Sequence, residues 1–410
     1  MSHDFGRFAA FGRLAGAGAR LPQAPGRLAP LPDFGSNPGG LKAHIHVPAT
    51  ATRGAPLVVV LHGCTQTAAE YDHRAGWSAL ADRAGFVLLY PEQNHGNNPN
   101  LCFNWFRPGD ARRDAGEALS IRQMIATMVE AHGLDPERIF VTGLSAGGAM
   151  ASVMLATYPE VFAGGAVIAG LAYGRATTVP EAFDCMRGQS PASDEDLWRL
   201  LREGADHDGP WPKIAIWQGM AAHTVAPTNA ADIATQWRGV HRLGEEPAEI
   251  ERLGVREKRV WRNAACDAVI ELNTVAGMGH GTPLSAELGA AGPYMLDVGI
   301  SSTLEIAGFW GIAEPAGAAA THPATAAPEA AAPRSAVPSP AAPSQATLSP
   351  AALSPAALSP ASAPGLHSRG PKAAEPPREP SGHIPRHVPR RVAAVGKVIE
   401  DALRAAGLMR

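Results

Sequence analysis

The chain has 410 residues, and its 35 lysine and arginine residues nearly balance its 38 aspartate and glutamate residues, which gives a net charge of −3. This balance argues against a general nucleic-acid binder and against a protein held on an anionic membrane surface by charge. No stretch approaches the roughly 18 consecutive apolar residues of a transmembrane helix, and glycines and arginines interrupt the N-terminus where a secretory signal would be continuously apolar. We therefore expect a cytoplasmic protein, with secretion as the alternative.

Composition divides the chain into four parts. Residues 1–40 form a segment rich in Gly, Ala, Pro and Arg, in which phenylalanines recur at the spacing of a short amphipathic helix. Residues 41–313 have the spread of apolar side chains expected of one folded domain, ample to bury a core. Residues 314–390 are dominated by Ala, Pro and Ser, which is typical of a disordered linker. Residues 391–410 place apolar side chains on one helical face, and this C-terminal helix either packs on its own domain or binds a partner.

The domain alternates predicted strands with predicted helices. Strand signals are short apolar or alternating runs, and helix signals are longer runs that a glycine or proline ends. An irregular insertion spans residues 171–212. The alternation predicts an α/β protein with a mostly parallel sheet, helices on both faces and an active site at the carboxyl ends of the strands. The expected strands are 41–47 at an edge, 57–61, 86–90, 138–142, 166–169, 214–217, 248–262 and 269–275, and the expected helices are 67–84, 115–132, 146–158, 228–241 and 301–310.

The stretch Gly143-Leu144-Ser145-Ala146-Gly147 has the pattern of a G-x-S-x-G turn between a strand and a helix. In such a turn the serine is pushed out of the backbone, and flanking glycines are needed because a Cβ atom would clash there. The helix N-terminus that follows offers free N–H groups to a developing negative charge. We interpret Ser145 as a nucleophile; the alternative is a glycine-rich turn that only packs a helix close to the sheet.

A serine hydroxyl needs a base within hydrogen-bond reach, and in this type of site the histidine follows the nucleophile in the chain. His280 fits this order, because it lies in the glycine-rich loop 277–281 directly after a predicted strand. His62 and His73 are competitors, but both precede Ser145.

Acyl transfer also needs two N–H donors for the oxyanion, one from the residue after the serine and one from the turn after the first buried strand. The backbone N–H groups of Ala146 and Cys64 occupy these positions. The Cys64 thiol has no basic partner placed by the sequence, so we do not assign it as a nucleophile. Its side chain is either inert or paired with Cys102. The four cysteines, Cys64, Cys102, Cys185 and Cys266, are too few for a disulfide scaffold and lack the spacing of a metal site.

Five segments follow one another in a specific order: Leu61-His62-Gly63-Cys64-Thr65-Gln66, Cys102-Phe103-Asn104-Trp105-Phe106, Gly116-Glu117-Ala118-Leu119-Ser120-Ile121-Arg122-Gln123, Gly143-Leu144-Ser145-Ala146-Gly147-Gly148 and Gly277-Met278-Gly279-His280-Gly281-Thr282-Pro283. Together they resemble the poly(3-hydroxybutyrate) depolymerase family of esterases, which is related to feruloyl and acetylxylan esterases. The resemblance covers roughly residues 41–313 and returns at residues 398–408.

The resemblance implies an α/β-hydrolase fold and hydrolysis of carboxylic esters, among them polymers or oligomers of short-chain 3-hydroxyalkanoates. It implies that Ser145 and His280 are nucleophile and base, with Cys64 and Ala146 donating to the oxyanion. Trp105 is a candidate wall for an apolar acyl chain; the alternative is a core tryptophan. An ester is the implied partner, and neither a metal nor an organic cofactor is implied.

The chain departs from the family pattern at the triad acid. The family turn has the form Trp-x-Gly-x-x-Asp-x-x-Val, and in the corresponding stretch from Trp217 to Val225 the aspartate position holds Ala222. No Asp or Glu occurs from residue 213 through residue 231. Removing the acid of such a triad lowers turnover by a factor on the order of 10⁴ and leaves residual catalysis from the other groups.

Other carboxylates near this position in the sequence are poorly placed. Asp206 and Asp208 precede the strand, Asp232 follows inside a helix, and Glu181 and Asp184 lie in the insertion. Three interpretations remain: a slow Ser–His enzyme, an enzyme with a relocated acid, and a hydrolase-fold protein that binds with little chemistry. We expect a serine carboxylesterase acting on short-chain 3-hydroxyalkanoate esters, with a weakened binding protein or a feruloyl or acetyl esterase as alternatives.

Overall fold

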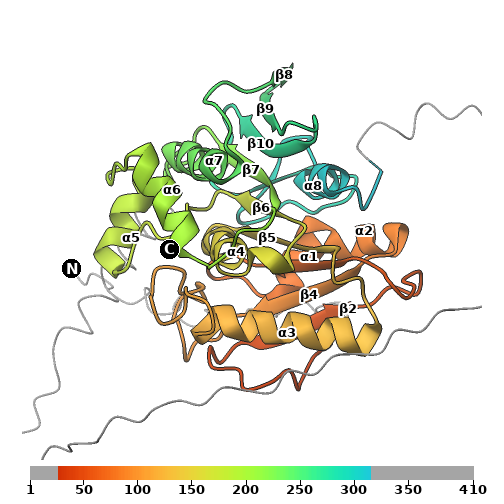
Figure 1. Ribbon diagram of the computed structural model, residues 1–410. Coiled ribbons are helices and arrows are strands. Elements are labelled where there is room, and N and C mark those ends of the chain that lie inside the picture. The colour runs from red at the N-terminus through yellow and green to blue at the C-terminus, as the bar shows by residue number, and fades with distance from the viewer. Residues whose placement is uncertain (1–25, 315–410) are drawn as a thin grey trace, which may run out of the picture. The chain divides into compact units, whose positions relative to one another are not determined.

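The computed structural model describes residues 26–314 of the chain (Figure 1). The expected N-terminal helix, the Ala-, Pro- and Ser-rich segment beyond residue 314 and the expected C-terminal helix lie outside these residues. None of the helices within 26–314 is long and apolar enough to span a membrane.

Ten strands of the described region form one sheet in the order β1-β2-β4-β3-β5-β6-β7-β10-β9-β8 (Figure 1). The central strands from β4 to β10 run parallel, and antiparallel strands flank them on both sides. The prediction of a mostly parallel sheet is therefore confirmed. The strands are β1 (Ala29–Pro30), β2 (Lys42–His46), β3 (Leu57–Leu61), β4 (Val87–Glu92), β5 (Ile139–Leu144), β6 (Gly164–Ile168), β7 (Lys213–Gly219), β8 (Glu249–Leu253), β9 (Arg256–Arg262) and β10 (Ala268–Val275), with a separate parallel pair β11 (Thr282–Leu284) and β12 (Met295–Asp297).

Helices cover both faces of this sheet. In β3 the side chains of Leu57, Val59 and Leu61 pack into one apolar cluster with α3, α4 and α7, while Val58 and Val60 pack into a second cluster with α1, α2 and α8. Both faces of the strand are thus buried, which explains its continuous apolar sequence. The helices are α1 (Ala68–Ala75), α2 (Trp77–Ala84), α3 (Gly116–His132), α4 (Ala146–Thr157), α5 (Val179–Met186), α6 (Asp194–Glu203), α7 (Thr228–His241) and α8 (Ser302–Trp310), with a short 3₁₀ turn at Pro159–Val161.

The folded part begins before the predicted domain boundary at residue 41. β1 pairs antiparallel with β2, and Phe34 is buried in the core, so part of the expected N-terminal linker is folded. For the same reason β2 is not the edge strand that its alternating sequence predicted.

Two predictions about helices were wrong in detail. The single helix expected over 67–84 is two helices, because Gly76 between them takes a left-handed conformation with φ 76°. The insertion expected to be irregular over 171–212 contains α5 and α6, and Trp198 of α6 donates to the Thr235 carbonyl of α7 at 2.8 Å.

Candidate active site

Ser145 lies at the turn between β5 and α4, where its backbone has φ 57° and ψ −117°. Such a positive φ is strained for a residue with a side chain and is typical of functional positions. A Cβ atom on Gly147 would overlap the carbonyl oxygens of Leu61 and His62, and one on Gly143 would overlap the Gly147 carbonyl. The glycines are therefore needed because the start of α4 packs directly against β3 and β5.

The hydroxyl of Ser145 faces the ring of His280, which comes from the loop after β10. Oγ of Ser145 and Nε2 of His280 are 2.9 Å apart, although 135 residues separate them in the chain. After the histidine, the Thr282 N–H donates to the Tyr294 carbonyl at 2.8 Å and the Thr282 hydroxyl lies 3.1 Å from the Tyr71 hydroxyl. The parallel order β5-β6-β7-β10 brings the two loops to the same edge of the sheet.

Burial lowers the pKa of His280 to about 4. At neutral pH the imidazole is therefore uncharged and is able to accept a proton through one nitrogen. Its other nitrogen, Nδ1, is buried and has no hydrogen-bond partner within residues 26–314. In a Ser–His–Asp site that nitrogen donates to the acid.

At the position predicted for the triad acid the chain has Ala222, whose side chain is a methyl group. Ala222 is buried in the turn after β7, and this turn contacts the histidine loop: the Ala221 N–H donates to the Met278 carbonyl at 2.9 Å. A Cβ atom on Gly219, at the end of β7, would overlap the Gly279 carbonyl. The turn and the loop that carries His280 therefore pack backbone against backbone.

The carboxylates considered as relocated acids make other contacts. Glu181 accepts from the N–H and the hydroxyl of Thr177, both at 2.8 Å. Oδ1 of Asp184 lies 3.7 Å from Nη1 of Arg187, and Oδ2 of Asp232 lies 3.6 Å from Nη2 of Arg175. Since Nδ1 of His280 has no partner, the hypothesis of a relocated acid is wrong for the described part of the chain.

The turn after β3 carries the candidate oxyanion donor Cys64. Its N–H donates to no acceptor within residues 26–314, and Ala146 is the first residue of α4, where an N–H has no intrahelical partner. The Cys64 and Cys102 sulfurs form a disulfide, which confirms one of the two alternatives for this thiol, whereas Cys185 and Cys266 are free. The disulfide ties the candidate oxyanion turn to the loop 93–106.

His62 and His73, the competitors for the base, lie elsewhere. His62 is buried, and its pKa is lowered by that burial; its Nε2 accepts from the Gln93 N–H at 3.1 Å and its Nδ1 lies 2.8 Å from the Gly63 carbonyl. His73 is exposed in the last turn of α1. His62 therefore belongs to the support of the oxyanion turn.

Glu117 in the first turn of α3 was missed by the sequence analysis as a site-supporting residue. It is buried, and its carboxylate accepts from the Asn104 N–H at 2.8 Å, the Asn104 side-chain amide at 2.7 Å and the Gln93 side-chain amide at 2.6 Å. Burial raises the pKa of Glu117 to about 8. Its position four residues before the core side chain Ile121 was a usable signal, because it places the carboxylate on the apolar face of the helix.

Trp105 is 9% exposed and packs edge-on against Phe106, with ring centroids 5.5 Å apart. Its ring belongs to the core cluster formed with α3 and α4, and its role as a wall for an acyl chain stays a prediction.

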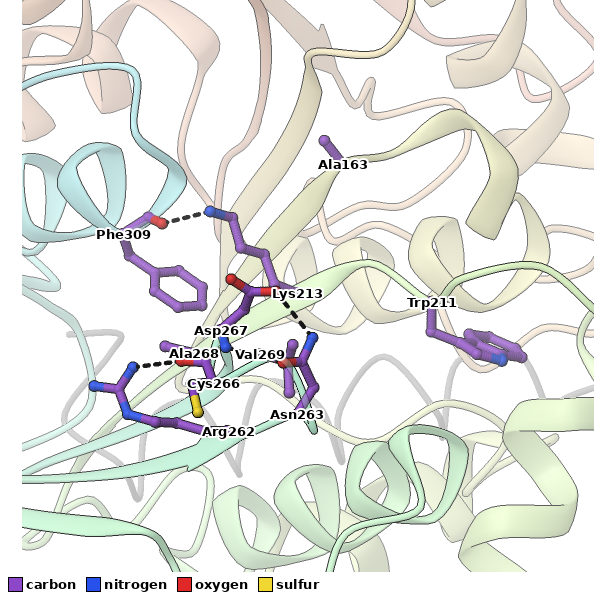
Figure 2. Close-up of a pocket in the computed structure, with 10 residues that line it drawn as sticks. All are labelled: Ala163, Trp211, Lys213, Arg262, Asn263, Cys266, Asp267, Ala268, Val269 and Phe309. Carbon is purple, nitrogen blue, oxygen red and sulfur yellow. Dashed lines mark hydrogen bonds between the residues drawn. The ribbon is translucent and has the colours of Figure 1, made fainter.

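A cavity of about 540 Å³ lies at the opposite edge of the sheet, at the amino ends of β7 and β10 (Figure 2). Lys213 lies in its wall and donates to the Phe309 carbonyl at 2.6 Å, and Asn263 donates to Asp267 at 3.1 Å. None of the predicted catalytic residues lines this cavity, so it is separate from the Ser145–His280 pair.

Comparisons with known proteins identify the family to which this chain is similar. A family model described as esterase PHB depolymerase matches residues 42–246. Poly(3-hydroxyalkanoate) depolymerase C of Paucimonas lemoignei is 46% identical over 294 residues, which are 70% of this chain and 70% of that protein. An acetylxylan esterase of Coprinopsis cinerea is 30% identical over 279 residues, which are 65% of this chain and 73% of that protein.

Among solved structures, an acetyl xylan esterase from Aspergillus awamori superposes with a TM-score of 0.61 at 25% identity, covering 70% of this chain and 100% of that one. The sheet order, the helices on both faces and this match identify an α/β-hydrolase fold, as expected.

Proposed function

The chain belongs to the PHB depolymerase family of esterases, and from this premise we propose that it hydrolyses short-chain 3-hydroxyalkanoate esters through an acyl-enzyme on Ser145. The observation that carries the proposal is the 2.9 Å distance from Ser145 Oγ to His280 Nε2, with Ser145 held at a positive φ before α4. A nucleophile, a neutral base and a helix N-terminus then converge on one point at the carboxyl edge of the sheet.

The reaction follows from these positions. Oγ of Ser145 attacks the ester carbonyl carbon while its proton moves to Nε2 of His280. The former carbonyl oxygen becomes negative and accepts from the N–H groups of Cys64 and Ala146. The carbon–oxygen bond then breaks, and the leaving alkoxide takes the proton from the imidazolium. A water molecule then attacks the carbonyl carbon of the acyl-enzyme while its proton moves to His280. The bond to Oγ breaks, His280 returns the proton to Oγ, and the carboxylic acid is released.

The choice of substrate rests on the relatives. The 46% identity to a protein named poly(3-hydroxyalkanoate) depolymerase exceeds the 30% identity to one named acetylxylan esterase, which favours a hydroxyalkanoate ester. Acetyl esters, and with them feruloyl esters, are the second candidate, because the solved acetyl xylan esterase is matched over its whole length.

A catalytically weakened binding protein with the hydrolase fold is the alternative from a different class. Ala222 at the acid position favours it, and so does Nδ1 of His280, which has no hydrogen-bond partner within residues 26–314 to stabilise an imidazolium formed during the reaction. The Ser145–His280 geometry favours the enzyme.

The Cys64–Cys102 disulfide supports secretion over the cytoplasmic location expected from the sequence, because disulfides persist in oxidising compartments. Counting thiols in protein unfolded without reductant tests this: two reactive thiols, from Cys185 and Cys266, are expected, and four would contradict it.

Hydrolysis of p-nitrophenyl butyrate by wild type, Ser145→Ala and Ala222→Asp tests the proposed function. We expect wild type to exceed Ser145→Ala, and equal rates in all three proteins would overturn the proposal. Chromatography of the products from 3-hydroxybutyrate oligomers and from acetylated xylo-oligosaccharides then separates the two substrate candidates.

A further inference from the structure

We propose that Tyr294 is a positioning residue for His280, and that its ring takes over the task of orienting the imidazole that the acid performs in a Ser–His–Asp site. The inference rests on the proposed function, because it assigns a further residue to the reaction of Ser145 and His280. Tyr294 lies between β11 and β12, outside the loop 277–281 that carries the histidine.

Hydrogen bonds alone hold the His280 ring weakly. Within residues 26–314 its one hydrogen bond joins Nε2 to Oγ of Ser145 at 2.9 Å, whereas Nδ1 has no partner. The torsion that turns a histidine ring about its Cβ–Cγ bond has broad minima, so the side chain does not fix the ring by itself. The bond to Ser145 is also given up during the reaction, because Oγ becomes the ester oxygen of the acyl-enzyme. Packing must then keep the imidazole in place.

The ring of Tyr294 supplies such packing. The ring centroids of His280 and Tyr294 are 6.2 Å apart, and the two planes form an angle of 74°. This edge-to-face arrangement lies within the distance range, about 4.5 to 7 Å, in which aromatic pairs attract one another. Rotation of the imidazole about its Cβ–Cγ bond would break the arrangement. The contact therefore favours one orientation of the histidine ring.

The backbone of Tyr294 is tied to the residues that directly follow His280. The Thr282 N–H donates to the Tyr294 carbonyl at 2.8 Å, and a Cβ atom on Gly281 would overlap the same carbonyl. One residue further on, Met295 pairs with Thr282 in the sheet of β11 and β12. The position of the tyrosine is thus set by the histidine segment itself.

Tyr294 occupies a backbone position at which a tyrosine is unfavourable. It is the third residue of the turn Gly292-Pro293-Tyr294-Met295, whose ends exchange two hydrogen bonds of 3.0 Å, and its φ is 60°. Glycine or asparagine is the usual residue where the third position of a turn has a positive φ. Strain of this kind persists where the side chain has a function, and Ser145, the other neighbour of the His280 ring, shows the same feature with φ 57°.

The test compares wild type with Tyr294→Phe, Tyr294→Leu and Tyr294→Gly in the hydrolysis of p-nitrophenyl butyrate. Tyr294→Phe keeps the ring and is expected to retain kcat within about 2-fold. Tyr294→Leu and Tyr294→Gly are expected to lower kcat by roughly 3- to 10-fold with KM unchanged, because the loss of an aromatic pair then acts on the transition state alone. Tyr294→Gly also relieves the positive φ, so it removes the ring without straining the turn. Pro293→Ala, which changes the exposed neighbour in the same turn, is the matched control and is expected to keep the wild-type kcat.

Urea unfolding of each variant shows that it is folded. Wild-type kcat in folded Tyr294→Leu and Tyr294→Gly would overturn the inference and leave the proposed function standing. The inference also fails if KM rises while kcat is unchanged, which would place the ring against the substrate. It fails as well if Tyr294→Phe or Pro293→Ala is as slow as Tyr294→Leu, because the hydroxyl or the turn would then be the cause. A wild type no faster than Ser145→Ala would overturn the proposed function and the inference with it.

Discussion

The carbonyl of Gly63 and Nδ1 of His62 are 2.8 Å apart, and the bond between them fixes the direction of the Cys64 N–H. The Gln93 N–H donates to the other ring nitrogen at 3.1 Å, so Nδ1 carries the hydrogen and donates to the carbonyl. The Gly63 carbonyl and the Cys64 N–H belong to one planar peptide unit and point in opposite directions. The hydrogen bond that fixes the Gly63 carbonyl therefore also fixes the direction of the Cys64 N–H.

His62→Ala removes this constraint. We expect kcat to fall by roughly 10- to 100-fold with little change in KM, because the oxyanion forms only in the transition state. Steady-state kinetics with p-nitrophenyl butyrate measure the two constants separately. His73→Ala, on the exposed side of α1, is the control, and an unchanged kcat in a folded His62→Ala protein would contradict the role.

Ala222→Asp is expected to change the pH profile. In wild type the pKa of His280 is about 4, so the base stays neutral and kcat/KM has no acid limb between about pH 5 and 8. A carboxylate beside the ring favours the imidazolium and raises that pKa, so the acid limb moves to higher pH while the plateau rises by up to roughly 10⁴. A pH–rate profile of both proteins measures the shift. An acid limb at the same pH in both would show that the new carboxylate does not reach His280.

Glu117 makes stability depend on pH. Its folded pKa, about 8, lies above its ordinary value of 4.5, so the folded state holds the proton more tightly and is stabilised below about pH 4.5. This contribution, on the order of 5 kcal/mol, is lost as the pH rises through 8. We expect Glu117→Gln, which does not titrate, to show a smaller fall in unfolding free energy from pH 5 to 8 in urea titrations. Glu130→Gln, on an exposed position of the same helix, should keep the wild-type slope.

The Cys64–Cys102 disulfide closes a loop with a sequence separation of 38 residues. In the chain-entropy model a loop of this size stabilises the folded state by about 3 to 4 kcal/mol. A Cys64→Ala, Cys102→Ala double variant is therefore expected to unfold at lower temperature in calorimetry, and to lose turnover because the oxyanion turn is no longer tied to the loop 93–106. Cys266→Ser, which changes an exposed free thiol, should match wild type in both measurements.

The parts of the site that local sequence encodes could be predicted. The G-x-S-x-G turn requires glycine at positions 143 and 147, because a side chain at either position would overlap backbone atoms. His280 lies in a short glycine-rich loop after the last strand of the main sheet, and this position limits where its side chain is able to lie. The order of apolar runs predicted the parallel sheet because each buried strand must be apolar on both faces.

Contacts between distant segments could not be predicted in the same way. The role of Glu117 depends on Gln93 and Asn104, which reach it from a loop that carries no periodic pattern. The helices of the insertion are a different case, because Thr178 and Ser193 cap α5 and α6 in the sequence pattern of a capping box, with acidic residues three positions later. These two helices could therefore have been predicted from the sequence.

The separation of Ser145 from His280 by 135 residues has a consequence for the order of folding. β10, which precedes the histidine loop, takes its place beside β7 although α7 and the β8–β9 hairpin lie between them in the chain. Such a non-local strand pairing forms slowly compared with local contacts. Ser145 and His280 meet only when β10 has paired with β7, and we expect no serine esterase activity before that step. The recovery of esterase activity after dilution from urea is therefore expected to report the pairing of β10 with β7.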